Sequence, residues 1–273
     1  VPAMPAVIGN EGAGVVEAVG DSVTEVGVGD RVAYSMSLGS YAEQRVVDAA
    51  RLVKVPDAIT DQQAAAMMLK GCTVQYLIRR IYPVKPGDTI LLHAAAGGVG
   101  LIACQWAKHL GATVIGTVGS DEKAELARAH GCDHAIVYTR ENVPERVRAL
   151  TDGAGVPVVF DSVGKDTFMA SLDCLQPRGL MVSYGNASGA VEPFSPGVLA
   201  AKWSLFLTRP TLATYIKSRE ELDTTTTDLF DVVQSGAVKV EVSQVFPLED
   251  AAQAHRDLEA RKTTGSTVLT MEG

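Results

Sequence analysis

The stretch HAAAGGVG at residues 93–100 constrains the fold of this chain more than any other stretch. It comes directly after the apolar run DTILL and directly before LIACQWAKHLGATVIGTV. Small residues between a strand and a helix permit a tight turn, and they let backbone N–H groups approach a ligand closely. A Gly-rich turn that binds nothing is the alternative interpretation, so the sequence around the turn has to decide.

From residue 88 onward, apolar strands alternate with helices. The expected strands are TILLHA, TVIGTV, HAIVY, PVVFDSV and LMVSYG, and the expected helices are LIACQWAKHLG, EKAELARAHG, VPERVRALTD and TFMASLDCLQ. This alternation predicts an α/β fold with a doubly wound parallel sheet covered on both faces. In that context the turn aligns with the dinucleotide pattern GxGxxG as Ala95-x-Gly97-x-x-Gly100, with alanine in place of the first glycine. The sequence therefore predicts a dinucleotide-binding turn.

The first 60 residues have a different sequence pattern, in which short Val-rich runs are interrupted by Gly, Asp and Pro. Such runs favour an antiparallel, barrel-like β region. The stretch DQQAAAMMLKGCTVQYLIRRI then predicts one long helix. After Pro210 we expect a helix over ELDTTTTDLFDVVQSG, the segment VKVEVSQVFPL, a further helix and a final strand STVLTM.

Composition excludes several classes of function. A chain of 273 residues with 47% hydrophobic content can form one large domain or two smaller ones. The net charge of −8 argues against binding to nucleic acid or to an anionic membrane, since both need clustered Lys and Arg. No apolar run is long enough to cross a bilayer, and the first residues lack the pattern of a signal peptide. The widely spaced Cys72, Cys104, Cys132 and Cys174 indicate reduced thiols. We expect a cytoplasmic protein.

The end of the second strand of the alternating series indicates which dinucleotide is bound. In NAD-binding folds a carboxylate at this position takes the ribose 2′-hydroxyl, but here TVIGTV is followed by Gly119 and Ser120. A hydroxyl, backbone N–H groups and the ammonium of Lys123 suit a 2′-phosphate. Glu122 is the counter-argument, although its position favours a solvated helix residue. The residues favour NADPH.

Several stretches together resemble the zinc-free NADPH:quinone oxidoreductase branch, which includes zeta-crystallin, of the medium-chain dehydrogenase/reductase superfamily. The resemblance runs essentially from end to end. The stretches that carry it are GNEGAGVVEAVG, VGDRVAY, AAAGGVG, DSVG, SYGNASG, LTRPTL and FPLEDAAQAHRDLEARKTTGSTVL.

The resemblance implies a Rossmann domain for NADPH over residues 72–211. That domain is inserted in a barrel-like, GroES-like catalytic domain, which comprises residues 1–71 and 212–273. It also implies a homodimer. Family members carry a further segment before the stretch that matches Val1, so the N-terminal part of the barrel is missing here. Because that segment supplies the residues of the substrate pocket, the catalytic residues stay unassigned, and we expect this chain to bind NADPH but to reduce quinones poorly.

The resemblance also implies the cofactor residues. Gly98 and Val99, next to Gly97, would bring backbone to the pyrophosphate, and Ser120, Lys123, Tyr138 and Arg261 would surround the 2′-phosphate beside Gly119. The nicotinamide and its ribose would face residues of three stretches, which are Thr73 and Tyr76, then Ser162 and Val163, and finally Tyr184, Gly185 and Asn186.

Metal is not expected in this chain. In the zinc-dependent relatives a His precedes the Glu of the first glycine motif and a four-cysteine lobe holds a second zinc. Here Asn10 precedes Glu11, and no Cys occurs before Cys72. Zinc needs three or four converging ligands, and the sequence offers no such set.

The expected function is reduction of quinones with NADPH, in one- or two-electron steps. Hydride transfer needs little from the protein beyond orientation and a dry pocket. An enoyl-thioester or alkenal reductase is one alternative, and a non-catalytic, crystallin-like NADPH-binding protein is another. His93, at a buried strand end, is expected to be a core histidine without chemistry of its own.

Overall fold

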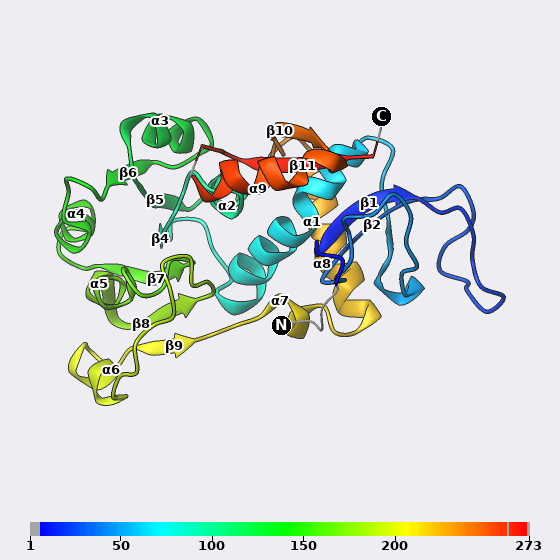
Figure 1. Ribbon diagram of the computed structural model, residues 1–273. Coiled ribbons are helices and arrows are strands. Elements are labelled where there is room, and N and C mark those ends of the chain that lie inside the picture. The colour runs from blue at the N-terminus through cyan, green and yellow to red at the C-terminus, as the bar shows by residue number, and fades with distance from the viewer. Residues whose placement is uncertain (1–5, 261, 272–273) are drawn as a thin grey trace. The chain divides into compact units, whose positions relative to one another are not determined.

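The computed structural model describes residues 6–260 and 262–271 (Figure 1). The chain divides into two compact units. The first combines residues 1–75 with residues 212–273, and the second is the continuous segment 76–211. The family resemblance predicts the two boundaries at 71/72 and 211/212.

The second unit is built on a six-stranded parallel sheet. Its strands are β4 (Thr89–Leu92), β5 (Thr113–Val118), β6 (His134–Val137), β7 (Val156–Asp161), β8 (Leu175–Ser183) and β9 (Phe206–Thr208). They lie in the order β6-β5-β4-β7-β8-β9, and every neighbouring pair is parallel (Figure 1). The chain starts in the middle of the sheet, runs to one edge, returns and runs to the other. The doubly wound parallel sheet expected from the sequence is thereby confirmed.

The helices of this unit cover the sheet. They are α2 (Gly98–His109), α3 (Asp121–Ala129), α4 (Val143–Leu150), α5 (Phe168–Cys174) and α6 (Gly197–Ala201). On one face Val147 of α4 and Leu172 of α5 pack on Ile115 of β5 in a common buried cluster. Neighbouring strand residues point to opposite faces, so Gly116 belongs to the other face. A β-carbon on Gly116 would lie 2.6 Å from the β-carbon of Ala95, so only glycine fits at this approach of strand and turn.

The first unit contains two small sheets. Strands β1 (Glu11–Val15), β2 (Arg31–Ser35) and β3 (Val53–Lys54) form an antiparallel sheet, while β10 (Val242–Pro247) and β11 (Ser266–Thr270) pair in parallel. In the described part of this unit the strands pair only within these two sheets and do not close into a barrel.

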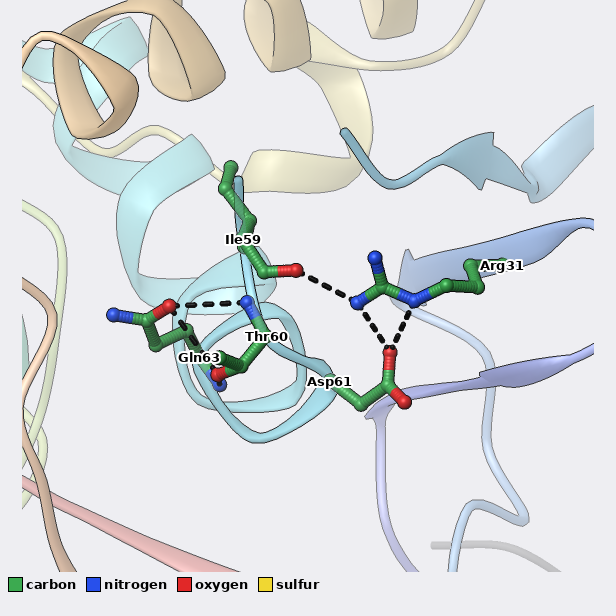
Figure 2. A network of polar contacts seen from close by, with 5 residues as sticks. All are labelled: Arg31, Ile59, Thr60, Asp61 and Gln63. Atoms are coloured by element: carbon green, nitrogen blue, oxygen red, sulfur yellow. Dashed lines mark hydrogen bonds and ion pairs between the residues drawn. The ribbon is translucent and has the colours of Figure 1, made fainter. Parts of the chain in front are cut away.

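The helices of the first unit are α1 (Asp61–Gln75), α7 (Leu212–Tyr215), α8 (Arg219–Gln234) and α9 (Ala251–Glu259). Figure 2 shows how α1 begins. The Thr60 hydroxyl accepts from the N–H of Gln63 at 3.2 Å, and the Gln63 side chain accepts from the N–H of Thr60 at 3.0 Å. This reciprocal pair satisfies two N–H groups that the helix leaves unpaired. Arg31 of β2 also donates to Asp61 at 2.7 Å and to the Ile59 carbonyl at 2.7 Å. The start of α1 is therefore tied to the antiparallel sheet.

The single helix expected over residues 61–81 changes its hydrogen-bonding pattern within that range. The α-helix ends at Gln75, and Tyr76–Ile81 is π-helical. The boundary between the two compact units falls at the same place. π-helical turns are rare and occur often at functional positions.

Candidate functional site

The turn after β4 has the geometry of an anion-binding turn. Its Ala94 has a positive φ of 54°, and the Ala94 carbonyl accepts from the N–H of Gly97 at 2.9 Å. Helix α2 follows with Gly97 as its N-cap, which offers no side-chain hydrogen bond. The first N–H groups of a helix have no partner inside it, so the backbone of Gly98 and Val99 is free to bind an anion.

The end of β5 places Ser120 and Lys123 together. Ser120 is the N-cap of α3, and its hydroxyl accepts from the N–H of Lys123 at 3.4 Å. A hydrogen bond from Ser120 also lowers the pKa of the exposed Glu122. Within residues 6–260 and 262–271, no carboxylate pairs with the ammonium of Lys123. The turn thus combines a helix N-terminus and a free ammonium with one exposed carboxylate.

Tyr138, which follows β6, lies against this turn. A β-carbon on Gly119 would lie 2.9 Å from the phenol oxygen of Tyr138, so a side chain at Gly119 would displace the tyrosine. Tyr138 is 53% exposed. An exposed aromatic ring that is held over a glycine leaves its hydroxyl accessible, and the structure therefore brings Gly119, Ser120, Lys123 and Tyr138 into one place.

The turns after β7 and β8 pack on each other. The carbonyl of Ser162 accepts from the N–H of Ala187 at 3.1 Å, and the carbonyl of Val163 accepts from the N–H of Ser188 at 2.9 Å. A β-carbon on Gly185 would lie 2.4 Å from the carbonyl oxygen of Ser162, so this contact between the two turns requires glycine. The predicted residues of the two turns therefore form one surface.

Tyr184 follows β8, and Tyr76 lies near enough to influence its phenol. Burial raises the pKa of Tyr184 above the usual range of a phenol, while a hydrogen bond with the Ser162 side chain opposes that shift. Tyr76 is close enough to raise the pKa of Tyr184 further, and it is itself only 2% exposed. The π-helical segment thus places Tyr76, one of the predicted residues, near the strand ends of the second unit.

Two further predicted residues belong to the first unit or lie outside the described residues. Thr73 lies on α1 of the first unit, where its hydroxyl donates to the Leu69 carbonyl at 2.7 Å. Arg261 lies outside the described residues.

His93 is a buried histidine whose two ring nitrogens are both hydrogen-bonded, as the sequence predicts for a core residue. Its Nδ1 lies 2.9 Å from the Thr117 hydroxyl and its Nε2 lies 2.9 Å from the Ser171 hydroxyl. Ser171 in turn donates to Asp161 at 2.8 Å. Thr117, Asp161 and Ser171 are not among the residues predicted from the sequence. An aspartate at the end of the apolar strand PVVFD is the signal that could have found this group.

No group of three or more His, Cys, Asp or Glu side chains in the described part of the chain is arranged to hold a metal ion. Glu11 is engaged elsewhere, since its carboxylate accepts from the N–H of Leu69 at 2.8 Å and pairs with Lys70 at 3.2 Å. Within the same residues, no helix has the length and apolar character needed to cross a bilayer.

The first unit holds a cavity of about 870 Å³. It is lined by β1, β2, residues 40–47 and β11, among them Tyr34, Tyr41 and Arg45. Among the residues that the structure describes, none of those predicted to bind the cofactor lines this cavity.

The chain matches two family models. Residues 1–57 match the alcohol dehydrogenase GroES-like domain, and residues 98–224 match the zinc-binding dehydrogenase family. A quinone oxidoreductase of Pseudomonas aeruginosa is 56% identical over 269 residues, which are 98% of this chain and 83% of that protein. A 2-haloacrylate reductase of a Burkholderia species is 49% identical, over 97% of this chain and 81% of that protein.

A solved structure of Escherichia coli quinone oxidoreductase in complex with NADPH superposes with a TM-score of 0.96. It is 50% identical to this chain and matches 98% of it and 83% of its own chain. Identity at this level over nearly the whole chain, together with the two family models, leaves one assignment. The chain belongs to the quinone oxidoreductase family of the medium-chain dehydrogenase/reductase superfamily.

Proposed function

We propose that the chain is an NADPH:quinone oxidoreductase whose second unit holds NADPH across the carboxyl ends of β4, β5, β7 and β8. The observation that carries the proposal is the turn at residues 94–97, which opens α2 beside the point where the strand order reverses, between β4 and β7. In open parallel sheets, ligands bind in the crevice at this point.

The turn fits a pyrophosphate. Gly97 is exposed, and Gly98 and Val99 are half-buried, so their backbone is accessible. A β-carbon on Gly100 would lie 2.3 Å from the Ala94 carbonyl oxygen, and this lets the helix start directly under the turn. The N–H groups of Gly98 and Val99 would donate to the phosphate oxygens, and the partial positive charge of the helix N-terminus would add to their effect.

The 2′-phosphate would lie against Ser120, Lys123 and Tyr138, which gather beside Gly119. A dianionic phosphate forms strong charge-assisted hydrogen bonds with an ammonium group. Glu122 is exposed at the same turn, where its carboxylate is hydrogen-bonded to Ser120. Arg261 is proposed to add a second cation.

The nicotinamide end would lie against the surface that the turns after β7 and β8 form together. This surface includes Ser162, Val163, Tyr184, Gly185 and Asn186, with Tyr76 beside it. Thr73 is proposed to contact the same end of the cofactor. The phenol of Tyr184 is neutral at physiological pH, as phenols are, and partial burial raises its pKa further above the usual range. These residues would orient the nicotinamide ring and exclude water from one of its faces.

When bound, NADPH supplies a hydride to the acceptor. The residues of the chain supply binding and orientation, which are the protein's main contribution to hydride transfer. No catalytic residue is assigned, and we propose that no metal takes part.

The organisation of the whole molecule follows from the same proposal. Residues 72–211 would be the NADPH-binding domain, and residues 1–71 with 212–273 would be the GroES-like catalytic domain. We also propose a homodimer, which is supported by the edge strand β9, where Phe206 is 62% exposed. An unpaired strand edge with a large apolar side chain favours pairing with a second copy.

Reduction of an activated carbon–carbon double bond is the second candidate. The observation that favours it is the relative named 2-haloacrylate reductase, at 49% identity. An acrylate carries a double bond next to a carboxyl group, and a hydride can attack such a bond as it attacks a quinone.

A panel of acceptors tests these proposals. NADPH oxidation is followed by absorbance with quinones, enones, enoyl thioesters and 2-haloacrylates, and NADPH binding is measured by fluorescence titration. We expect a preference for NADPH over NADH and turnover with quinones that is slow in this chain, because the resemblance places the substrate pocket largely in a segment before Val1. Turnover with activated alkenes alone would favour the second candidate. Binding of NADPH without turnover of any acceptor would favour a non-catalytic NADPH-binding protein.

A further inference from the structure

A chain of buried hydrogen bonds runs across three strands of the second unit. It joins Thr117 of β5, His93 at the end of β4, Ser171 of α5 and Asp161 at the end of β7. All four side chains are nearly inaccessible, with Thr117 at 1%, His93 at 2% and both Ser171 and Asp161 at 0% exposure. Buried polar groups cost folding free energy unless they are paired, so a complete chain of this kind needs an explanation.

The hydrogen bonds of Asp161 determine which group donates and which accepts in every link of this chain of hydrogen bonds. One carboxylate oxygen accepts from the N–H groups of Val163 at 2.8 Å and Gly164 at 3.0 Å. The other accepts from the hydroxyls of Thr167 at 2.7 Å and Ser171 at 2.8 Å. Four donors surround the two carboxylate oxygens, which therefore act as acceptors. The Ser171 hydroxyl therefore donates its only hydrogen to Asp161.

The same logic determines the tautomer of His93. The Ser171 oxygen has only lone pairs left, so the His93 Nε2 at 2.9 Å has to donate to it. Burial lowers the pKa of His93, while the charge of Asp161 opposes the shift, and the neutral ring has a single N–H. Its Nδ1 therefore accepts from the Thr117 hydroxyl at 2.9 Å.

Each end of this chain of hydrogen bonds lies next to a turn that carries proposed cofactor residues. His93 precedes Ala94, whose positive φ of 54° costs about 1–2 kcal/mol in a residue other than glycine. Thr117 lies two residues before Gly119, and its carbonyl accepts from the N–H of Ala95 at 3.0 Å. Asp161 precedes Ser162, and its carboxylate holds the N–H groups of the turn that follows. One set of hydrogen bonds therefore fixes three separate turns.

We propose that Thr117, His93, Ser171 and Asp161 act as positioning residues that hold the turns after β4, β5 and β7 in the conformation that binds NADPH. This inference rests on the proposed placement of NADPH at these turns. Breaking one link would lower the population of the binding-competent turns, and the apparent Kd would rise in proportion.

The first test measures the tautomer of His93 in the cofactor-free protein. Long-range ¹H–¹⁵N correlation spectra of histidine-labelled protein distinguish the two tautomers, and His93→Gln identifies the resonances among the five histidines. We expect a neutral His93 protonated at Nε2. A ring protonated at Nδ1, or at both nitrogens at neutral pH, would overturn the proposed direction of the chain.

The second test uses two substitutions at one position. Thr117→Val keeps the shape of the side chain and removes the donor to His93, whereas Thr117→Ser keeps the donor and removes a methyl group. We expect Thr117→Val to raise the Kd of NADPH about fivefold, as the loss of one hydrogen bond does, and Thr117→Ser to leave it unchanged while lowering Tm. Ser171→Ala is expected to raise the Kd by a similar factor.

The matched controls are Thr225→Val and Ser35→Ala, at buried hydroxyls of the first unit that have no hydrogen-bond partner. We expect them to leave the Kd unchanged. If Thr117→Val and Ser171→Ala lower Tm but leave the Kd unchanged, the four residues stabilise the fold only and the inference is wrong. If the unaltered protein fails to bind NADPH, the proposed function fails instead, and the tautomer measurement still tests the direction of the chain.

Discussion

The carbonyl oxygen of Ala94 occupies the place that a side chain on Gly100 would need. A β-carbon on Gly100 would lie 2.3 Å from that oxygen and 2.5 Å from the carbonyl oxygen of Ala95. Both are backbone atoms at a turn of unusual conformation, because Ala94 has a φ of 54°. Neither atom can move without opening the turn, so turn and helix are fitted to each other.

Gly100→Ala should therefore damage both stability and NADPH binding. Overpacking of this kind costs typically about 1–3 kcal/mol, and here it also displaces the N–H groups proposed to bind the pyrophosphate. Urea unfolding and fluorescence titration measure the two effects. Gly197→Ala is the control, since its β-carbon would have no neighbour closer than 3.5 Å. Equal stability of both variants would contradict the expectation.

Lys123→Ala should weaken NADPH binding and leave NADH binding nearly unchanged. The loss of a charged hydrogen bond costs about 1.5–3 kcal/mol, which amounts to a 10- to 150-fold rise in Kd. Lys85→Ala, an exposed lysine before β4 at the opposite edge of the sheet, serves as the control and should change neither affinity. Equal losses for both cofactors in Lys123→Ala would show that this lysine does not contact the 2′-phosphate.

Stability should fall below pH 6.5 because of His93. Burial lowers the pKa of His93 from its ordinary value of 6.5, so below that pH the unfolded chain takes up a proton that the folded protein does not. The stabilising effect is complete above pH 6.5 and is lost as the pH falls toward the lowered pKa, by up to about 1.4 kcal/mol per pH unit. Urea unfolding between pH 5 and 8 measures this slope, and His93→Gln should lack it. An identical pH dependence in both proteins would refute the assignment.

Zinc should be absent from the purified protein. The family resemblance predicts that Asn10 takes the position of a zinc-binding histidine in zinc-dependent relatives, and the Glu11 carboxylate is bound to the Leu69 N–H and to Lys70. Elemental analysis after purification without added metal is expected to find far less than one zinc per chain, and treatment with a chelator should not change Tm. A stoichiometric metal content would contradict the prediction.

Phe206→Asp should disrupt the proposed dimer. A charge at the edge strand β9 disfavours pairing with a second copy. Analytical ultracentrifugation is expected to show a dimer for the unaltered protein and a monomer for the variant. Leu258→Asp, at a 57% exposed residue of α9, should remain dimeric. A monomeric unaltered protein would remove the basis of the proposal.

The alternating half of the chain was the most predictable from the sequence. Buried strands such as TVIGTV and the helices between them show their periodicity directly, and Ser120 before an acidic turn signals the start of α3. The sequence also predicts that the turns after these strands lie at one edge of the sheet, because the carboxyl ends of parallel strands meet there. The role of their residues in binding NADPH stays a prediction.

Contacts between distant residues were not predictable in this way. Ser171 is an ordinary small polar residue in a helix, and only the fold brings its hydroxyl to Asp161 and His93, the latter 78 residues away in the sequence. Glu11 and Leu69 are likewise 58 residues apart. Hydrophobic periodicity also does not predict the change to a π-helix at Tyr76, because YLIRRI is compatible with continuation of α1.

The division into one continuous and one interrupted unit sets the order in which they can fold during translation. The second unit is complete once Thr211 has left the ribosome, but the first then lacks everything from Leu212 onward. Gly71 of α1 packs on Leu229, and the Ala66 carbonyl accepts from the Ser266 hydroxyl at 3.4 Å. Helix α1 can therefore pack fully only after these late segments have been synthesised. We therefore expect the nascent first unit, rather than the second, to depend on chaperones that shield apolar surface.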